Sequence, residues 1–144
     1  MSQQQLAEKV IERLMAADAR INALLGLTLA SIEPGRASCQ LTVRLELVNS
    51  HNFCHGGVIF ALADTALAYA SCSTNRSGVT QAASINFIRP AKLGDVLTAT
   101  AVVEQDGRRA SACSVRVTNQ LNQLVALVTA ANLRFDEPVI ELES

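Results

Sequence analysis

Aromatic residues are scarce in this 144-residue chain. It has no Trp, Tyr69 is its only Tyr, and aromatic residues make up 3% of the sequence. Hydrophobic residues nevertheless reach 49% and charged residues stay at 17%, a balance that argues against disorder. We therefore expect a packed core built mainly from Ala, Val, Leu and Ile. The length suits a single domain spanning residues 1–144.

Concentrated positive charge is also lacking. The net charge is −1, from 12 Lys and Arg against 13 Asp and Glu, and no basic cluster stands out. Nucleic acids and anionic lipids are both recognised through concentrated Lys and Arg. The sequence therefore predicts no nucleic-acid partner and no membrane partner.

Disulfides, a secretion signal and a membrane span are likewise not indicated. The four cysteines form no C-x-x-C pair and are scattered, at Cys39, Cys54, Cys72 and Cys113. A chain this long and apolar needs no disulfides for stability. The N-terminal segment MSQQQLAEKVIERL carries charge throughout, and the longest apolar run, residues 58–72, is too short for a normal membrane span. We expect a cytoplasmic protein with reduced thiols.

Hydrophobic periodicity predicts an N-terminal helix, two strands, a second helix and four further strands. The first helix is expected over residues 3–17, within a helical segment of residues 1–25. Strands are predicted over residues 27–32, 41–47, 80–88, 96–105, 109–118 and 124–135. Turns are expected at residues 33–35, 106–107 and 119–123, a loop at 48–54 and a frayed acidic tail at 136–144.

The second helix, residues 57–73, is apolar on nearly every face and should be buried all round. An antiparallel sheet that curls around the helix would cover part of it. About six short strands cannot cover the remainder, so a partner subunit is the expected source. The sequence thus predicts an α+β fold that assembles at least as a dimer.

Asp64 lies in the middle of this apolar helix. Burying an ionised carboxylate costs on the order of several kcal/mol unless it is paired or hydrogen-bonded. Asp64 is therefore either functional or satisfied at a polar seam by a neighbouring backbone group or hydroxyl, and the sequence leaves both readings open.

The helix begins at Gly56-Gly57. Glycine permits unusual backbone angles and close approach by a ligand, and the first N–H groups of a helix have no intrahelical partner. These donors and the helix dipole could stabilise a developing oxyanion, although a plain glycine-rich loop that caps a buried helix would look the same.

Spacing connects the helix start with the carboxylate. Gly57 and Asp64 are seven residues apart, which is about two turns and ~10 Å of helix. They share a face but are too far apart to act on one carbonyl. Two such helices, side by side and antiparallel in a dimer, would bring Asp64 of one chain to the helix start of the other. We therefore predict an active site shared between subunits.

The segment HGGVIFALADTA, residues 55–66, resembles the HGG…LAD-x-A signature of hotdog-fold thioesterases, and most of all the PaaI-type phenylacetyl-CoA thioesterases. The resemblance extends to INFIRP at residues 85–90 and GD at 94–95, and covers roughly residues 26–135. It implies a hotdog fold, a curved antiparallel sheet wrapped around a central helix, in a homodimer or homotetramer with active sites at subunit interfaces. The implied reaction is hydrolysis of acyl-CoA, such as phenylacetyl-CoA or hydroxyphenylacetyl-CoA, to free acid and CoA in phenylacetate degradation, with no cofactor or metal.

The resemblance also implies roles for single residues. Asp64 would be the nucleophile or general base, and these two roles stay open. The N–H of Gly56 would polarise the thioester carbonyl, and Asn49 would orient the carbonyl or a water. His55 would support the loop and could contact the thioester end of the substrate. Substrate contacts are expected from Gly57, Thr65, Thr80 and Arg89. Arg89 is the best candidate for the CoA phosphates, with Lys92 and Arg76 as alternatives that could equally be solvated charges.

Other functions are less consistent with these residues. His51, Cys54 and His55 could suggest zinc, but no further ligands cluster with them. A Cys54–His55 nucleophile lacks an orienting third group. An acyl-thioester hydratase or dehydratase would combine a His with an acidic residue in motifs not found here. A non-catalytic acyl-CoA binding module remains an alternative, and release of free thiol from acyl-CoA would exclude it.

Overall fold

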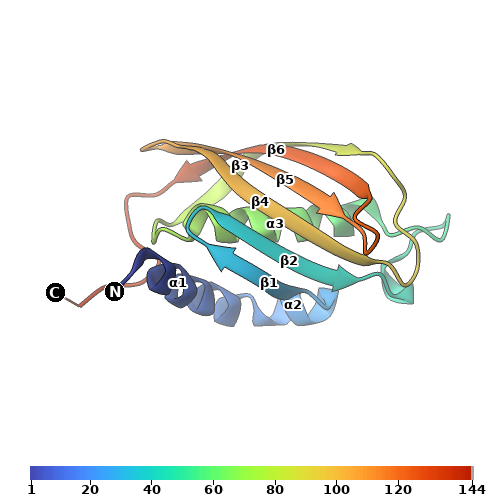
Figure 1. The fold of residues 1–144 in the computed structure, drawn as a ribbon, viewed down its shortest axis with the longest axis horizontal. Coiled ribbons are helices and arrows are strands. Elements are labelled where there is room, and N and C mark those ends of the chain that lie inside the picture. Colours follow the sequence, from blue (N-terminus) through green and yellow to red (C-terminus); the bar gives the residue numbers. More distant parts are fainter. Residues whose placement is uncertain (144) are drawn as a thin grey trace.

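Six strands form one antiparallel sheet that curls around a long helix (Figure 1). The computed structural model describes residues 1–143. The helices are α1 (Gln3–Ala17), α2 (Ala19–Leu25) and α3 (Gly56–Cys72), with a short 3-10 helix at Leu45–Leu47. The strands are β1 (Thr28–Glu33), β2 (Arg36–Thr42), β3 (Gly78–Phe87), β4 (Val96–Asp106), β5 (Ala110–Thr118) and β6 (Leu124–Arg134). The order across the sheet is β1-β2-β4-β5-β6-β3, which confirms the predicted antiparallel sheet around a central helix.

The N-terminal helix α1 has the predicted bounds. Ser2 caps it, because the Ser2 hydroxyl accepts the N–H of Gln5 at 3.1 Å while the Gln5 side chain accepts the N–H of Ser2 at 2.8 Å. Its buried face packs Val10 and Ile11 into the core. A second short helix, α2, follows and ends at Gly26, whose φ of 68° suits glycine.

The prediction of a strand over residues 41–47 is wrong. Strand β2 ends at Thr42, and the N–H of Val43 continues its bonding to the β4 side by donating to the carbonyl of Asp95. The N–H of Leu47 then donates to the carbonyl of Arg44. The Leu47–Arg44 bond closes the 3-10 turn, and the outward side chain of Leu45 is 68% exposed. The real strand starts earlier, at Arg36, where small and polar residues gave no clear alternation.

The last four strands confirm the predicted run to within a few residues. The Asp106-Gly107 turn joins β4 to β5, and the Asn119–Gln123 turn joins β5 to β6. Strand β3 does not pair with its sequence neighbour β4 but crosses to β6, at the edge of the sheet. Within residues 1–143 the other edge of β3 has no strand beside it.

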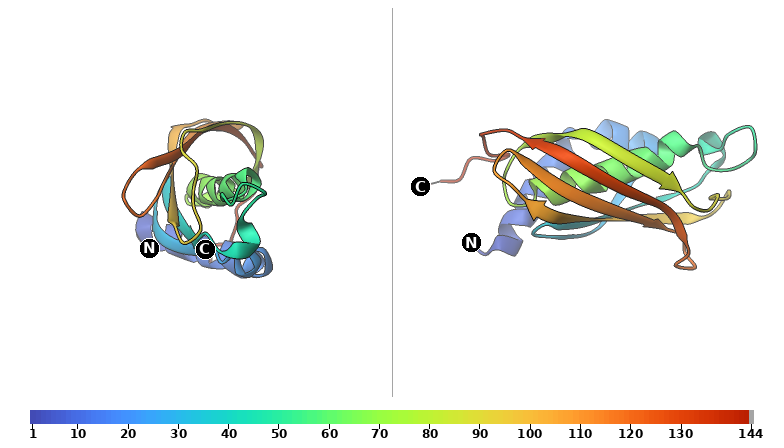
Figure 2. Two further views of the ribbon diagram at one scale, coloured as in Figure 1. Left: turned by 90° about the vertical axis from the view of Figure 1, so that its right-hand side faces the viewer. Right: turned by 90° about the horizontal axis from the view of Figure 1, so that it is seen from above.

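Helix α3 lies inside the curve of the sheet, which leaves one side of the helix uncovered (Figure 2). Residues that face the sheet, such as Leu62, Ala66 and Leu67, have no solvent exposure. The opposite side is only partly buried, at Val58, Ala61, Asp64, Thr65 and Ala68. The expected all-round burial therefore holds only for the sheet-facing side of a single chain.

The core is aliphatic, as the composition predicted. Tyr69 is the one aromatic residue among the fully buried hydrophobic residues of the described chain. Its hydroxyl donates to Asp18 at 2.9 Å and accepts from Asn22 at 3.0 Å, which ties α2 to α3. Among residues 1–143, no helix combines the length and the apolar character needed to cross a membrane.

Candidate active site

One backbone N–H at the start of α3 has no hydrogen-bond partner within residues 1–143. The imidazole Nδ1 of His55 accepts the N–H of Gly57 at 2.8 Å, and the carbonyl of His55 accepts the N–H groups of Val58 and Ile59. The N–H of Gly56 has no hydrogen-bond partner within residues 1–143. The helix start therefore presents a single unused amide, where the helix dipole adds positive potential.

At Gly56 and Gly57 there is little room for a side chain, because neighbouring side chains lie close to the backbone. Neither has a positive φ, so the expected unusual backbone angles are not found. A Cβ on Gly56 would lie 3.1 Å from the ring of Phe87, and a Cβ on Gly57 would lie 2.9 Å from Nδ1 of His55. The missing side chains let the Phe87 ring and the His55 imidazole contact the helix backbone directly.

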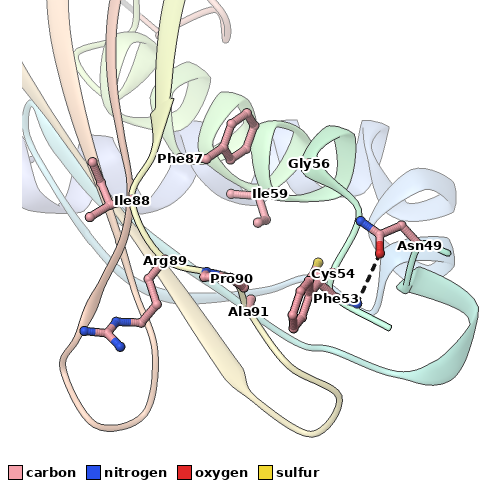
Figure 3. A pocket seen from close by; sticks show the side chains of 10 residues that line it. All are labelled: Asn49, Phe53, Cys54, Gly56, Ile59, Phe87, Ile88, Arg89, Pro90 and Ala91. Atoms are coloured by element: carbon pink, nitrogen blue, oxygen red, sulfur yellow. Dashed lines mark hydrogen bonds between the residues drawn. The ribbon is translucent and has the colours of Figure 1, made fainter. Parts of the chain in front are cut away.

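Asn49 is held with its amide nitrogen available. Its Oδ1 accepts the N–H groups of His51 at 2.9 Å and Phe53 at 3.2 Å, which closes the loop on itself. The amide nitrogen points towards the helix start (Figure 3). The loop is anchored by the N–H of Cys54, which donates to Ala91 at 2.8 Å, and by that of His55, which donates to Leu47 at 2.8 Å. Asn49 can therefore act as a donor from a fixed position.

A pocket of about 260 Å³ lies between the helix start and the end of β3 (Figure 3). Its walls are mainly apolar, with Phe53, Ile59 and Phe87 around the space. The complete lining is Asn49, Phe53, Cys54, Gly56, Ile59, Phe87, Ile88, Arg89, Pro90 and Ala91. Apolar walls with a few placed donors are typical of small-molecule binding sites. The guanidinium of Arg89 points away from Gly56, towards the outside.

Asp64 has a hydroxyl partner from β3. The Oγ1 of Thr80 donates to Oδ1 of Asp64 at 2.7 Å, and the other carboxylate oxygen has no partner within residues 1–143. The alternative prediction for Asp64 was a carboxylate satisfied by a neighbouring hydroxyl. It holds for Oδ1 only. The second oxygen stays available on the half-buried face of α3.

A β-bulge aims Thr80 at Asp64. Thr80 and Ile85 both face α3, although five residues separate them, an odd spacing that a regular strand places on opposite faces. The register of β3 against β6 shifts between Thr80 and Ala82, which makes Gln81 the extra residue. In a regular strand Gln81 would pair with Asn132 and face α3 in place of Thr80.

The chain places its predicted site residues in two separate groups. Asn49, Gly56 and Arg89 line the pocket, whereas Asp64 and Thr80 lie further along α3 and do not. Gly56 and Asp64 are eight residues apart, about 12 Å of helix. A single chain therefore does not bring the carboxylate to the unused amide.

Three other predicted site residues already form hydrogen bonds within the chain. The hydroxyl of Thr65 donates to the carbonyl of Ala61 at 2.8 Å, and the N–H of Gly57 is taken by His55. Arg76 bonds Asp106 at 3.3 Å and the carbonyl of Gly107 at 3.0 Å, where it supports the β4–β5 turn. Direct substrate contacts by Thr65 and Gly57 remain predictions, and Arg76 has a structural role.

The cysteine and zinc alternatives gain no support. Burial raises the pKa of the Cys54 thiol to about 11, which disfavours the thiolate that a nucleophile requires. The nearby His55 nitrogen already accepts the N–H of Gly57. Within residues 1–143, no three His, Cys, Asp or Glu side chains gather in a way that could hold a metal ion.

Sequence reasoning missed the aromatic walls of the pocket. Local sequence patterns indicate no role for Phe53 or Phe87, although Phe87 lies in the INFIRP segment that carries the resemblance. An apolar residue near a strand end was the only available signal. It becomes informative once the fold places the end of β3 against the start of α3.

Replacing Thr80 should test its bond to Asp64. A hydrogen bond to a charged group contributes about 1.5–3 kcal/mol, so Thr80→Val should lower kcat/KM of the expected thioester hydrolysis at least about tenfold. Thr80→Ser keeps the hydroxyl and should stay within about threefold of wild type. Steady-state kinetics on both variants measure the difference. Equal rates for Thr80→Val and Thr80→Ser would show that the bond does not matter.

Comparison with known proteins reveals the family. The model of the family described as "Thioesterase superfamily" matches residues 51–126, which is more than half of the chain and includes the helix start, Asp64 and Thr80. The chain belongs to the thioesterase superfamily. It is therefore a thioester hydrolase, and the predicted hotdog fold is confirmed.

Individual relatives agree with this assignment. The acyl-coenzyme A thioesterase PaaI of Escherichia coli is 42% identical over 103 residues, which cover 72% of this chain and 74% of that protein. The solved structure of E. coli PaaI, from the phenylacetic acid degradation operon, superposes with a TM-score of 0.92 at 35% identity, over 95% of this chain and 99% of the other. A Streptococcus mutans protein solved with acetyl-CoA matches with a TM-score of 0.75 at 35% identity, over 78% and 90% of the two chains.

Proposed function

We propose that this thioesterase hydrolyses aryl-acyl-CoA, such as phenylacetyl-CoA or hydroxyphenylacetyl-CoA, to the free acid and CoA. The unused N–H of Gly56, which opens into an apolar pocket, is the observation that carries the proposal. An acyl group in this pocket would place its carbonyl oxygen at the helix start. The name of the E. coli relative and the acetyl-CoA bound to the S. mutans relative support an acyl-CoA substrate.

The pocket walls favour a flat acyl group. The rings of Phe53 and Phe87 and the side chain of Ile59 surround a volume of about 260 Å³. Aromatic pairs in edge-to-face or offset contact contribute about 0.5–1.5 kcal/mol beyond the burial of their area. A phenyl ring gains these contacts with Phe53 and Phe87, whereas a short acyl group such as acetyl gains little.

The complete site needs a second copy of the chain. The half-buried face of α3 carries Asp64, and the outer edge of β3 has no strand beside it within residues 1–143. Pairing two β3 edges antiparallel would extend the sheet and set the two α3 helices side by side in opposite directions. Asp64 of one protomer would then face Gly56 of the other, so we propose a homodimer with two shared sites.

The proposed chemistry follows from these groups. The N–H of Gly56 donates to the thioester oxygen, and the amide nitrogen of Asn49 can donate to the same oxygen or to a water. Asp64 either attacks the carbonyl carbon, which breaks the C–S bond and leaves a mixed anhydride for water to hydrolyse, or takes a proton from water that attacks instead. Both routes release the CoA thiol and the carboxylic acid.

The redox state of the cysteines is relevant to the cellular compartment of the protein. All four are free, and all four are buried. Free thiols suit a reducing compartment. We therefore propose the cytoplasm as its location.

A panel of thioesters tests the substrate class. Phenylacetyl-CoA and hydroxyphenylacetyl-CoA should show kcat/KM values at least about tenfold above that of acetyl-CoA, because the ring buries apolar area that acetyl lacks. They should also exceed decanoyl-CoA, whose flexible chain loses conformational entropy on binding and offers no ring to pack against Phe53 and Phe87. A thiol reagent that reports free CoA measures every rate. A preference for acetyl-CoA or decanoyl-CoA would contradict the aryl-acyl assignment.

A further inference from the structure

Asn132 is a buried polar side chain that the proposed chemistry does not use. It lies on β6 and is only 3% exposed. Its Oδ1 has no hydrogen-bond partner within residues 1–143. Buried polar atoms of native proteins nearly always have a partner, and an ordered water is the usual one where no protein group serves.

Asn132 lies beside the hydroxyl that binds the catalytic carboxylate. Thr80 of β3 is its cross-strand partner. Both side chains face α3, because Thr80 bonds Asp64 there, and because Asn132 is buried while the next residue of β6, Leu133, is 39% exposed. Directly opposed side chains of this kind have Cβ atoms about 4.5–5.5 Å apart. One water molecule can therefore bridge the two side chains.

This pair of residues has two unused acceptors. The Oγ1 of Thr80 uses its only proton in the 2.7 Å bond to Asp64, and it accepts no hydrogen bond within residues 1–143. The Oδ1 of Asn132 is also an acceptor only. Two acceptors cannot bond to each other, whereas a water between them donates one proton to each.

A buried donor without a partner lies on the same face of β6. Arg134 follows Asn132 by two residues, and its Nε has no hydrogen-bond partner within residues 1–143. The rest of its guanidinium binds Asp106 at 2.7 Å and the carbonyl of Ser71 at 2.9 Å. An enclosed water typically makes about three hydrogen bonds to such groups. The unused acceptors and the unused donor in this part of the core are suitable partners for it.

We propose that Asn132 holds a structural water that orients the hydroxyl of Thr80. The water donates one proton to Oδ1 of Asn132 and the other to Oγ1 of Thr80. Because Oγ1 accepts from the water, its own proton stays directed at Asp64. Asn132 is thus a positioning residue that acts on the carboxylate through Thr80, and hydrolysis does not consume this water. The proposal rests on the role proposed above for Asp64.

Two substitutions of similar shape test the acceptor of Asn132. Asn132→Val removes the acceptor, whereas Asn132→Thr keeps an oxygen on a side chain that is also β-branched. Asn132→Val should lower kcat about three- to tenfold and change KM less than about twofold, because a hydrogen bond that orients Thr80 is lost. Asn132→Thr should stay within about twofold of wild type. Equal losses in the two variants would overturn the proposal.

A Thr80→Val background separates positioning from packing. Without the Thr80 hydroxyl, Asn132→Val should lower kcat no further. Ser111→Ala is the matched control, because Ser111 pairs with Asn132 on its other side and its hydroxyl lies 3.3 Å from that of Ser71 on α3. This variant loses a buried hydroxyl but should keep its kcat. A further loss in the Thr80→Val background, or an equal loss for Ser111→Ala, would show that Asn132 does not act through Thr80.

A crystal structure tests the water apart from the reaction. Wild-type protein should show a water within hydrogen-bond distance of Oδ1 of Asn132 and Oγ1 of Thr80, and Asn132→Val should lack it. A wild-type structure without this water would overturn the proposal whether or not the variant folds. A protein that holds this water but hydrolyses none of the thioesters would refute the proposed reaction and leave the water site standing.

Discussion

Asp64→Asn is expected to abolish thioester hydrolysis while the fold stays intact. The amide can neither attack the carbonyl nor take a proton from water, and the loss of a general base alone costs about 10²–10⁴-fold in rate. The Thr80 hydroxyl can still donate to the amide oxygen, so the local hydrogen bond survives. Release of free CoA thiol, followed under saturating substrate, measures the loss in kcat.

Asp18→Asn is the matched control for this substitution. Asp18 also accepts a hydroxyl, that of Tyr69 at 2.9 Å, but lies outside both groups of site residues. Its turnover should stay near wild type, and thermal unfolding should show both variants folded. If folded Asp64→Asn retained turnover within about tenfold of wild type, Asp64 would be neither nucleophile nor base.

Mixing two inactive variants is expected to restore about a quarter of wild-type activity. In the proposed dimer each site takes Asp64 from one protomer and Gly56 from the other. With Asp64→Asn and Gly56→Pro chains in equal amounts, half of the sites have an intact Asp64, and half of those face an intact Gly56. The recovered fraction of kcat, measured after subunit exchange, is therefore about one quarter.

The Gly56→Pro variant removes the amide with little change to the helix. Proline is favoured at the first helical position, and the extended backbone of His55 (φ −58°, ψ 133°) is compatible with a following proline. Loss of one oxyanion donor costs about 10²–10³-fold in kcat. Gly56→Ala is the control, because it adds the same contact with Phe87, at 3.1 Å, but keeps the N–H. It should stay much more active than Gly56→Pro.

Subunit exchange has to be established independently, for example by energy transfer between labelled chains. With exchange present, recovery of activity requires a site built from two chains, because every single chain carries a defect. No recovery under the same conditions would mean that each site lies within one chain, and the shared-site proposal would be wrong.

Much of this protein was predictable from local patterns. The helix over residues 3–17, the apolar helix that carries Asp64 and the final run of strands follow from hydrophobic spacing, which tertiary contacts did not override. The strand predicted at residues 41–47 is wrong, because alternation does not distinguish a strand from a backbone that leaves the sheet and turns at Leu45–Leu47. Most of strand β2 was not predicted, because Ala, Ser and Cys differ too little in polarity to reveal which face of a strand is buried.

The sequence by itself determined that one carboxylate lies about two helical turns from a glycine-rich helix start, and so that one chain could not join them. Only the tertiary structure decided which groups are free to act. It showed that His55 takes the amide of Gly57 and leaves that of Gly56, that a bulge turns Thr80 onto Asp64, and that the Phe87 ring lies against Gly56 at the helix start. Each of these depends on partners far apart in the chain or on a register shift of one residue. Periodicity and composition do not predict such contacts. They indicate which face of a helix or strand is buried, but not which atoms a side chain contacts.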